Sequence, residues 1–262
     1  MKNIDVDQDI ANFVAERLHS DVELQRLSKY HPQIKDALSE RARGVFRWVE
    51  CQFIELVRCP PSNFLIQKQL DSLPQTLDGT YARMLKNIPS VAKEHAQQMF
   101  AIICCATSPL TVPELIDALA VDAIEPLAKG AKPRFDKARR LEDADALRQV
   151  CPGFIEVVVD PETKVSTVRL AHFSVQEYLQ SQLITHSATA SEFMVETEKA
   201  QMMMAGICLA VLQGHVGIAL LLIDHGARAD LKYKSYENVF AAALDSGNEE
   251  MIRLLTEKGL AA

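Results

Sequence analysis

The sequence predicts a mostly α-helical fold with one small β-hairpin and a short C-terminal pair of helical repeats. Three observations lead to this fold class. Apolar residues recur at helical spacing over most of the chain, and the period changes to two residues after Pro152-Gly153. The last part of the chain then repeats itself, so that Gly214 and Gly226 return as Gly247 and Gly259.

Composition excludes several classes of protein. The chain has 262 residues, a net charge of −7 and 48% apolar residues, which is an ordinary globular balance. An acidic excess argues against a dedicated nucleic-acid binder. The six cysteines are irregularly spaced and include no C-x-x-C pair, so we expect neither a disulfide framework nor a zinc site. The charged N-terminus lacks the apolar core of a signal peptide, and we expect a cytoplasmic protein with reduced thiols.

Residues 9 to 58 are predicted to form helices, broken by the polar segment around His31-Pro32, and a turn follows at 59–63. A further helix is expected over 64–70, and Thr80, Tyr81 and Leu85 indicate another short one. The apolar positions at helical spacing are Ile10, Phe13, Val14, Leu18, Val45, Trp48, Val49, Phe53, Ile54 and Val57.

The middle third contains two sequences typical of a capping box. Thr111 stands three residues before Glu114, with Pro113 in the first turn, and an apolar helix face follows. Two β-rich runs around the turn at 160–163 predict a hairpin, with Val168, Leu170 and His172 on one face of its second strand. Ser174 and Glu177 then form the second capping box, which opens a helix through residue 184. Helix, helix, hairpin and helix in this order predict a winged-helix-like arrangement.

The repeat period is 33 residues, with one glycine between two short helices and another after the second helix. This is the ankyrin period, and tight turns between helices need the positive φ that glycine allows. The uncharged stretch between Lys199 and Asp224 is then explained as buried repeat helices, and no membrane span is expected. Two repeats are fewer than a stack needs, so we expect them to pack on residues 191–204, with the methionines at 202–204 filling the interface.

No motif in the sequence carries a reaction. A phosphate loop, a nucleophile elbow and an H-E-x-x-H pair are all missing, so we expect a protein that is not an enzyme and has no metal site. His215 and His225 flank a predicted repeat helix and are interpreted as turn and surface residues.

His172 has two interpretations. It precedes a helix N-terminus, where free N–H groups and a partial positive charge suit an anion, so the imidazole could donate to a phosphate. Alternatively it is a half-buried histidine that bonds a backbone carbonyl, and spacing alone favours this second interpretation.

The basic segment 129–140 also has two interpretations. Its six cations could contact DNA phosphates from a winged helix. Asp136 interrupts it and three acidic residues follow, which favours a solvated linker and helix face. The cations are Lys129, Lys132, Arg134, Lys137, Arg139 and Arg140, and the acidic residues are Glu142, Asp143 and Asp145.

Several motifs together resemble a known family. The segments ALSERARGVFRWVECQF, LPQTLDGTYARML, SPLTVPELIDALAV and VRLAHFSVQEYLQS occur in this order and resemble elements that follow the nucleotide-binding core in fungal NACHT-type (STAND) ATPases, relatives of NOD-like receptors. This resemblance covers about 35–185, and the ankyrin resemblance covers about 205–262. The chain resembles the C-terminal portion of such a protein without its nucleotide-binding core.

The resemblance implies roles for particular residues. In the family, a histidine at the hairpin-to-helix junction contacts the β-phosphate of ADP, and the matching residue is His172. The helix with Gly44, Phe46 and Trp48 matches the adenine-side lid, although Arg47 stands where the family has an apolar residue. Because the core is missing, we expect no cofactor in this chain, with ADP or ATP bound only in an intact relative.

These observations predict three domains: a helical lid domain at 1–90, a winged-helix-like domain at 91–188, and a linker with about two degenerate ankyrin repeats at 189–262. The expected function is a non-catalytic regulatory and protein-interaction module of a NACHT-ankyrin signalling switch. Expected partners are proteins at the ankyrin surface and a nucleotide-binding core in cis or trans, with no membrane and no nucleic acid. The alternative is a winged-helix DNA-binding regulator that uses residues 129–140.

Overall fold

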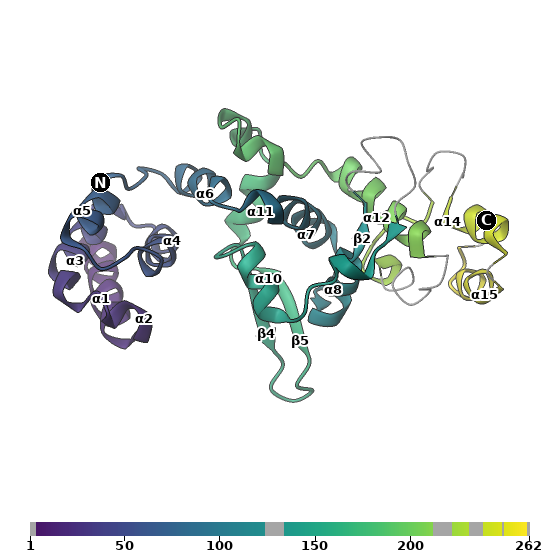
Figure 1. The fold of residues 1–262 in the computed structure, drawn as a ribbon, viewed down its shortest axis with the longest axis horizontal. Helices are drawn as coiled ribbons and strands as arrows, with labels where there is room; N and C mark the ends of the chain where they lie inside the picture. The colour runs from purple at the N-terminus through teal and green to yellow at the C-terminus, as the bar shows by residue number, and fades with distance from the viewer. Residues whose placement is uncertain (1–3, 124–133, 212–221, 231–237, 248, 261–262) are drawn as a thin grey trace. The chain divides into compact units, whose positions relative to one another are not determined.

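The structure, a computed structural model, describes residues 4–123, 134–211, 222–230, 238–247 and 249–260. The chain divides into two compact units, Met1–Lys86 (unit 1) and Asn87–Ala262 (unit 2), and Figure 1 shows their elements. The boundary between the two units lies after Lys86, and the sequence predicted the end of the lid domain at residue 90. Unit 2 keeps the expected winged-helix-like and C-terminal segments in one body.

The regular elements of unit 1 within residues 4–86 are all helices or 3-10 turns. Its elements are α1 (Ile4–Ser20), α2 (Val22–Gln25), the 3-10 turn η1 (Ser28–Tyr30), α3 (His31–Arg41), α4 (Phe46–Val57), α5 (Asn63–Asp71) and α6 (Leu77–Lys86). The break between helices lies at 26–30, and Pro32 sits in the first turn of α3, where its missing N–H costs no hydrogen bond.

The core of unit 1 follows the apolar spacing of the sequence. Ile10, Val14 and Leu18 of α1 are buried and pack with residues of α3 and α4. Trp48 is 2% exposed, and its indole N–H donates to the carbonyl oxygen of Pro74 at 3.0 Å. Val45 and Phe46, at the start of α4, remain more than a third exposed.

Unit 2 begins with helices around a small sheet and ends with further helices. Its elements are η2 (Ser90–Ala92), α7 (Lys93–Cys105), β1 (Leu110–Thr111), α8 (Val112–Leu119), β2 (Val121–Asp122), β3 (Arg134–Phe135), η3 (Lys137–Arg139), α10 (Ala144–Val150), β4 (Ile155–Val159), β5 (Ser166–Leu170), α11 (Phe173–Gln180), η4 (Gln182–His186), η5 (Ala190–Phe193), α12 (Thr197–Val211), α14 (Val239–Ser246) and α15 (Glu249–Glu257).

The predicted hairpin is β4 and β5, and it belongs to a three-stranded antiparallel sheet of order β1-β5-β4. Ile155 faces Leu170, and Val157 faces Val168 across the hairpin. The third strand, β1, is only two residues long and pairs Leu110 with Val168. So short a strand carries no period of its own, which is why the sequence did not indicate it. The sheet and the helices α7, α8 and α10 form the winged helix.

The first capping box is confirmed. The Thr111 hydroxyl accepts the N–H of Glu114 at 3.4 Å, and the Glu114 carboxylate accepts the N–H of Thr111 at 2.7 Å. The apolar face that follows points into the core, because Leu115, Ile116 and Leu119 are at most 3% exposed.

The prediction of a second capping box, formed by Ser174 and Glu177, is wrong. The N-cap of α11 is His172, so Ser174 lies inside the first turn and Glu177 is too far along the helix to reach back to the cap. The helix also stops earlier than expected, at Gln180. Ser181 is extended there, its hydroxyl donates to Tyr178 and accepts from Leu183, and these bonds end α11 and open η4.

The C-terminal helices agree with the predicted helix–glycine–helix unit where the structure describes it. Asn238 caps α14, and Gly247 ends it with a φ of +67°, in the left-handed region that glycine adopts without strain. The first predicted repeat falls largely on 212–221, outside the described residues, so the identification as ankyrin repeats stays a prediction. α14 contacts α12, in which Met203 and Met204 are buried and Met202 is 41% exposed.

Within the described residues, no helix combines the length and the apolar character that crossing a membrane requires.

Candidate functional site

His172 lies where the hairpin meets α11. Its backbone is extended (φ −161°, ψ 147°), and its Nδ1 accepts the N–H of Ser174 at 3.2 Å, which makes it the N-cap. The hydroxyl of Ser174 lies 2.7 Å from the same nitrogen. The imidazole therefore accepts one of the free N–H groups of the helix N-terminus, through a short-range contact with the residue two positions on.

The capping contact determines which nitrogen of the His172 ring carries the proton in the neutral form. Because Nδ1 accepts a backbone N–H, the neutral tautomer that fits this geometry carries its proton on Nε2. Neither sequence interpretation described this bond, since one expected a carbonyl partner and the other a phosphate. The side chain is half-buried, and its ring centroid lies 4.4 Å from that of Phe173, which is 68% exposed. An aromatic pair and one imidazole N–H thus stand at the start of α11.

A pocket of about 260 Å³ opens beside this helix end. Its walls are the loop after α7 (residues 106–109), β5 and the first turn of α11, and we call it the α7–α11 pocket. Gln176 closes one side and donates from Nε2 to the carbonyl oxygen of Cys104 at 3.1 Å. Arg169 also lines the pocket, but its guanidinium pairs with Glu156 across the hairpin. The pocket is therefore partly aromatic and has its one lining cation already paired.

The loop that forms one wall of this pocket also receives the C-terminal segment. Thr107 donates its N–H to the carbonyl oxygen of His225 at 2.9 Å. The His225 Nδ1 lies 2.7 Å from the Ser108 hydroxyl and 3.0 Å from the Ser108 carbonyl oxygen, and its Nε2 lies 3.5 Å from the Glu114 carboxylate. We call these bonds the His225 contact. They join residues more than a hundred positions apart.

Gly226 allows the C-terminal segment to lie close to Thr107. Its φ is +95°, and a Cβ atom at this position would lie 2.6 Å from the Cγ2 of Thr107, closer than two carbon atoms can approach. The sequence predicted the positive φ from the repeat but not the neighbour that excludes a side chain. His225 lies in a turn as expected, yet its side chain is only 15% exposed. His215 lies outside the described residues.

Two of the four cations in the described part of the basic segment are held in ion pairs. Arg139 pairs with Glu94 at 3.2 Å and Arg140 pairs with Asp117 at 2.6 Å, while Arg134 and Lys137 are exposed. Lys129 and Lys132 lie outside the described residues. Ion pairs that join the segment to α7 and α8 agree with a linker that packs along the domain.

The elements that a winged helix presents to DNA are not basic here. α8 and α10 correspond to the helix-turn-helix, so α10 is in the position of the recognition helix. Its N-cap is Asp143, and its Arg148 pairs with Asp145. At the hairpin tip, hydrogen bonds from Thr163 and then Glu162 hold the pKa of Asp160 below its usual range. The charges within α10 cancel and its N-cap is acidic, while the hairpin tip has two carboxylates and one lysine, so neither element offers the positive charge that phosphate contacts need.

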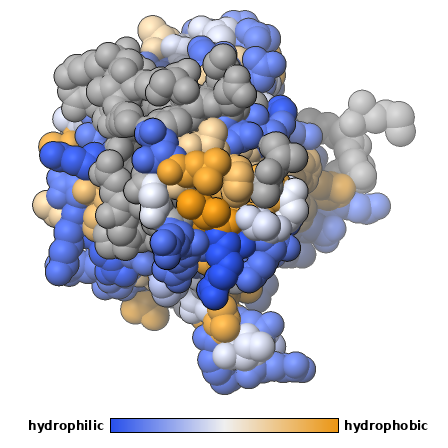
Figure 2. Space-filling model, turned by 90° about the vertical axis from the view of Figure 1, so that its right-hand side faces the viewer, coloured by the Kyte–Doolittle hydropathy of each residue, from blue (hydrophilic) through white to orange (hydrophobic). Residues whose placement is uncertain are grey.

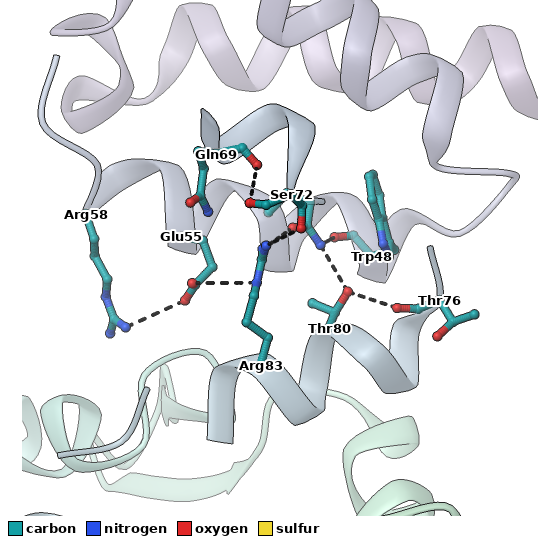
Figure 3. A network of polar contacts seen from close by, with 9 residues as sticks. Trp48, Glu55, Arg58, Gln69, Ser72, Thr76, Thr80 and Arg83 are labelled. Atoms are coloured by element: carbon teal, nitrogen blue, oxygen red, sulfur yellow. Dashed lines mark hydrogen bonds and ion pairs between the residues drawn. The ribbon is translucent and has the colours of Figure 1, made fainter. Parts of the chain in front are cut away.

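In unit 1, a buried polar network holds α6 on α4 (Figure 3). Gln52 is fully buried and donates from Nε2 to the hydroxyl of Thr80 at 3.2 Å, while its oxygen accepts from Arg83 at 2.8 Å. Arg83 also donates to the carbonyl oxygen of Ser72 at 3.1 Å and lies 4.0 Å from Glu55. Every labelled partner is a side chain or carbonyl of unit 1, which indicates a structural role.

The expected lid residues lie in the same unit. Gly44 has a φ of +83°, Phe46 is 39% exposed and packs edge-on against Phe13, and Trp48 is buried. Arg47, which departs from the family's apolar residue, is 8% exposed. Its guanidinium donates to the Tyr81 hydroxyl at 3.4 Å and pairs with Glu50 at 3.0 Å.

The remaining reactive side chains do not gather into a site. No group of three His, Cys, Asp or Glu residues could hold a metal ion among the residues that the structure describes. The cysteines are free, and burial raises the pKa of Cys51 to about 11 and the pKa of Cys104 and of Cys208 to about 12. Such thiols stay protonated at neutral pH and are poor nucleophiles.

Comparison with known proteins identifies the central domain. Residues 81–196 match the sequence model of the winged helix domain of GPI inositol-deacylase. The chain is also 37% identical, over 152 residues, to the azaphilone pigments biosynthesis cluster protein L of Monascus ruber. That match covers 56% of this chain and 31% of the relative, so the chain spans about a third of the relative's length. No solved structure matches the chain. The winged-helix prediction is confirmed.

Proposed function

We propose that this chain is a non-catalytic regulatory and protein-interaction module of a NACHT-type signalling switch, with the C-terminal helical repeats as its protein-binding surface. In this proposal the winged helix couples the nucleotide state of a core domain, in cis or in trans, to binding at the repeats. The chain itself holds no cofactor, and ADP or ATP belongs to an intact relative.

The observation that carries the proposal is the shared loop at 106–109. This loop lines the α7–α11 pocket together with Phe173, the residue that follows His172, and Thr107 and Ser108 of the same loop bond His225. A ligand that moves the start of α11 would therefore press on the same loop that holds the C-terminal segment. Coupling of two sites needs such a shared element, together with a difference in affinity between two states.

His172 is the residue proposed to face the nucleotide. With Nδ1 occupied by Ser174, its Nε2–H is the donor that remains for a phosphate oxygen. The capping bond also holds the imidazole in one orientation, so the Nε2–H group points in a fixed direction. The phosphate would be held by the core domain, and His172 would add one bond that exists only when the winged helix is closed on it.

Calorimetry with ADP tests the claim that the site is incomplete in this chain. The proposal expects no binding tighter than about 1 mM by the purified chain, since one donor and a helix end supply only a small part of the free energy of nucleotide binding. His172→Asn is the matched control, because asparagine keeps the N-cap and removes the imidazole. Micromolar binding that H172N abolishes would show a complete nucleotide site and overturn the proposal.

Duplex DNA tests the alternative of a DNA-binding regulator. The lack of excess positive charge on α10 and the ion pairs of Arg139 and Arg140 lead us to expect no gel shift at low salt, where phosphate contacts are strongest. A shift that falls steeply with salt, and that Arg134→Ala or Lys137→Ala weakens, would favour the DNA-binding alternative.

A further inference from the structure

The outer edge of β4 is an unpaired strand edge. The order β1-β5-β4 places β5 in the middle, so β4 pairs on one side only. Asp160 donates its N–H to Val165, and Ala171 donates its N–H to Phe154, which sets the alternation of the ladder. Residues 154, 156, 158 and 160 therefore bond β5, and the N–H and C=O groups of Ile155, Val157 and Val159 point outward. None of these outward groups has a backbone partner within the described residues.

Between Ile155 and Val159 this edge carries no lysine, no proline and no bulge, three features that protect strand edges from pairing. Natural edges are blocked by lysine, proline, a bulge or an inward charge. The sequence of β4 is Ile-Glu-Val-Val-Val, its pairing with β5 is unbroken, and its one charge, Glu156, is paired with Arg169. Val159 is 55% exposed. The β4–β5 hairpin also extends beyond the other elements of unit 2 in Figure 1, and forms the projection at the lower edge of Figure 2, with apolar surface at its base.

The edge is complementary to itself. If two β4 strands pair antiparallel about Val157, then Val157 faces Val157 of the second copy and Ile155 faces Val159. All outward groups then meet partners in hydrogen-bonded pairs, giving up to about six bonds. Glu156 faces Val158, so no like charges meet. The same register brings Val157 and the exposed Val159 against apolar side chains of the second copy.

We propose that β4 is a homodimerisation edge, at which two copies of this chain join their three-stranded sheets through antiparallel β4–β4 pairing centred on Val157. The contact is isologous, so it closes at two copies. It is also small, which makes the dimer weak and dependent on concentration.

Sedimentation of the full chain measures this assembly. The mass should rise from the monomer value of 29.1 kDa toward twice that value between about 1 µM and 1 mM. Val157→Pro removes an outward N–H and leaves the ladder to β5 intact, so it should keep the fold by circular dichroism and stay monomeric. Val159→Lys should weaken the dimer at least about tenfold, whereas Val165→Lys, a matched charge at an exposed site across the turn from β4, should not.

Cross-linking tests the register and remains informative if the proline variant fails to fold. In the proposed pairing the two Val157 Cα atoms lie about 5.5 Å apart, within reach of a disulfide. The two Val159 Cα atoms lie about 14 Å apart, out of reach. Under mild oxidation V157C should cross-link and V159C and the unchanged chain should not. A monomer at every concentration, a dimer that V157P leaves intact, or equal cross-linking of both variants would overturn the proposal.

Discussion

His172 and His225 both contact a serine through Nδ1, but with opposite hydrogen-bond roles: the Nδ1 of His172 accepts the N–H of Ser174, whereas the Nδ1 of His225 faces the carbonyl oxygen of Ser108, which can only accept. Each holds its Nδ1 at 2.7 Å from a serine hydroxyl, and each lies in unit 2 at the end of a secondary-structure element. His172 bonds Ser174, two residues away, while His225 bonds Ser108, 117 residues away. The first contact therefore stabilises one helix end, whereas the second holds the C-terminal segment on the winged helix. A histidine–serine contact therefore has a local consequence when it joins sequence neighbours and a long-range consequence when it joins distant segments.

The largest expected effect is at the long-range contact. Gly226→Ala should destabilise unit 2 by about 2–4 kcal/mol, because alanine is strained at a φ of +95° and its Cβ would overlap the Cγ2 of Thr107. Urea unfolding followed by circular dichroism measures the change. Trp48 fluorescence, which reports on unit 1, serves as an internal reference.

Thr107→Ser separates the two causes. It removes the methyl group that G226A would meet and keeps the N–H that bonds His225. The double variant should recover part of the loss, and the part that remains is the backbone strain. Equal stability of G226A and the unchanged chain would show that this segment does not pack on Thr107.

His225→Ala should cost about 1–2 kcal/mol, since it removes the bonds to the exposed Ser108 and the interaction with the half-buried Glu114 carboxylate. His186→Ala is the matched control, because that imidazole is exposed in η4, and its loss should change the free energy of unfolding by less than about 0.5 kcal/mol. If the two variants cost the same, the His225 contact contributes nothing measurable.

His172→Ala should cost about 1 kcal/mol, the usual value for loss of an N-cap. His172→Asn should restore most of it, because the asparagine oxygen accepts the N–H of Ser174 in place of Nδ1. Thermal unfolding of both variants makes the comparison. A loss in H172N as large as in H172A would mean that packing of the ring against Phe173, and not the cap, is what stabilises α11.

The smallest expected change in stability concerns the two sequence patterns that predicted capping boxes. Thr111→Ala should cost about 1 kcal/mol, whereas Ser174→Ala should cost only a few tenths, because His172 is the cap of α11. Thermal unfolding measures both variants. Equal losses of stability would show that the Ser174 side chain caps α11, as the sequence predicted.

Much of unit 2 was predictable because its signals are local. The hairpin follows from a period of two, the Thr111–Glu114 box from four adjacent residues, and the positive φ of Gly226 from the repeat. The Ser174–Glu177 box failed because a histidine two positions earlier competes for the same N–H, and spacing alone does not rank two acceptors.

Long-range partners were not predictable from one sequence. Thr107 and Ser108 carry no pattern that points to His225, and β1 is a strand only because Val168 faces it. The ion pairs of the basic segment were not predictable either. Nothing in the sequence indicates that Arg139 pairs with Glu94 or that Arg140 pairs with Asp117. Such contacts depend on how distant elements pack.

Hydrogen exchange at the Thr107 amide tests most directly whether the C-terminal segment is held on the winged helix. This N–H donates to His225, so it should be protected in the unchanged chain. In G226A it should exchange faster together with the amides of α14 and α15, while the amides of β4 and β5 keep their protection. A Thr107 amide that exchanges freely in the unchanged chain, or that is unaffected by G226A, would contradict the account.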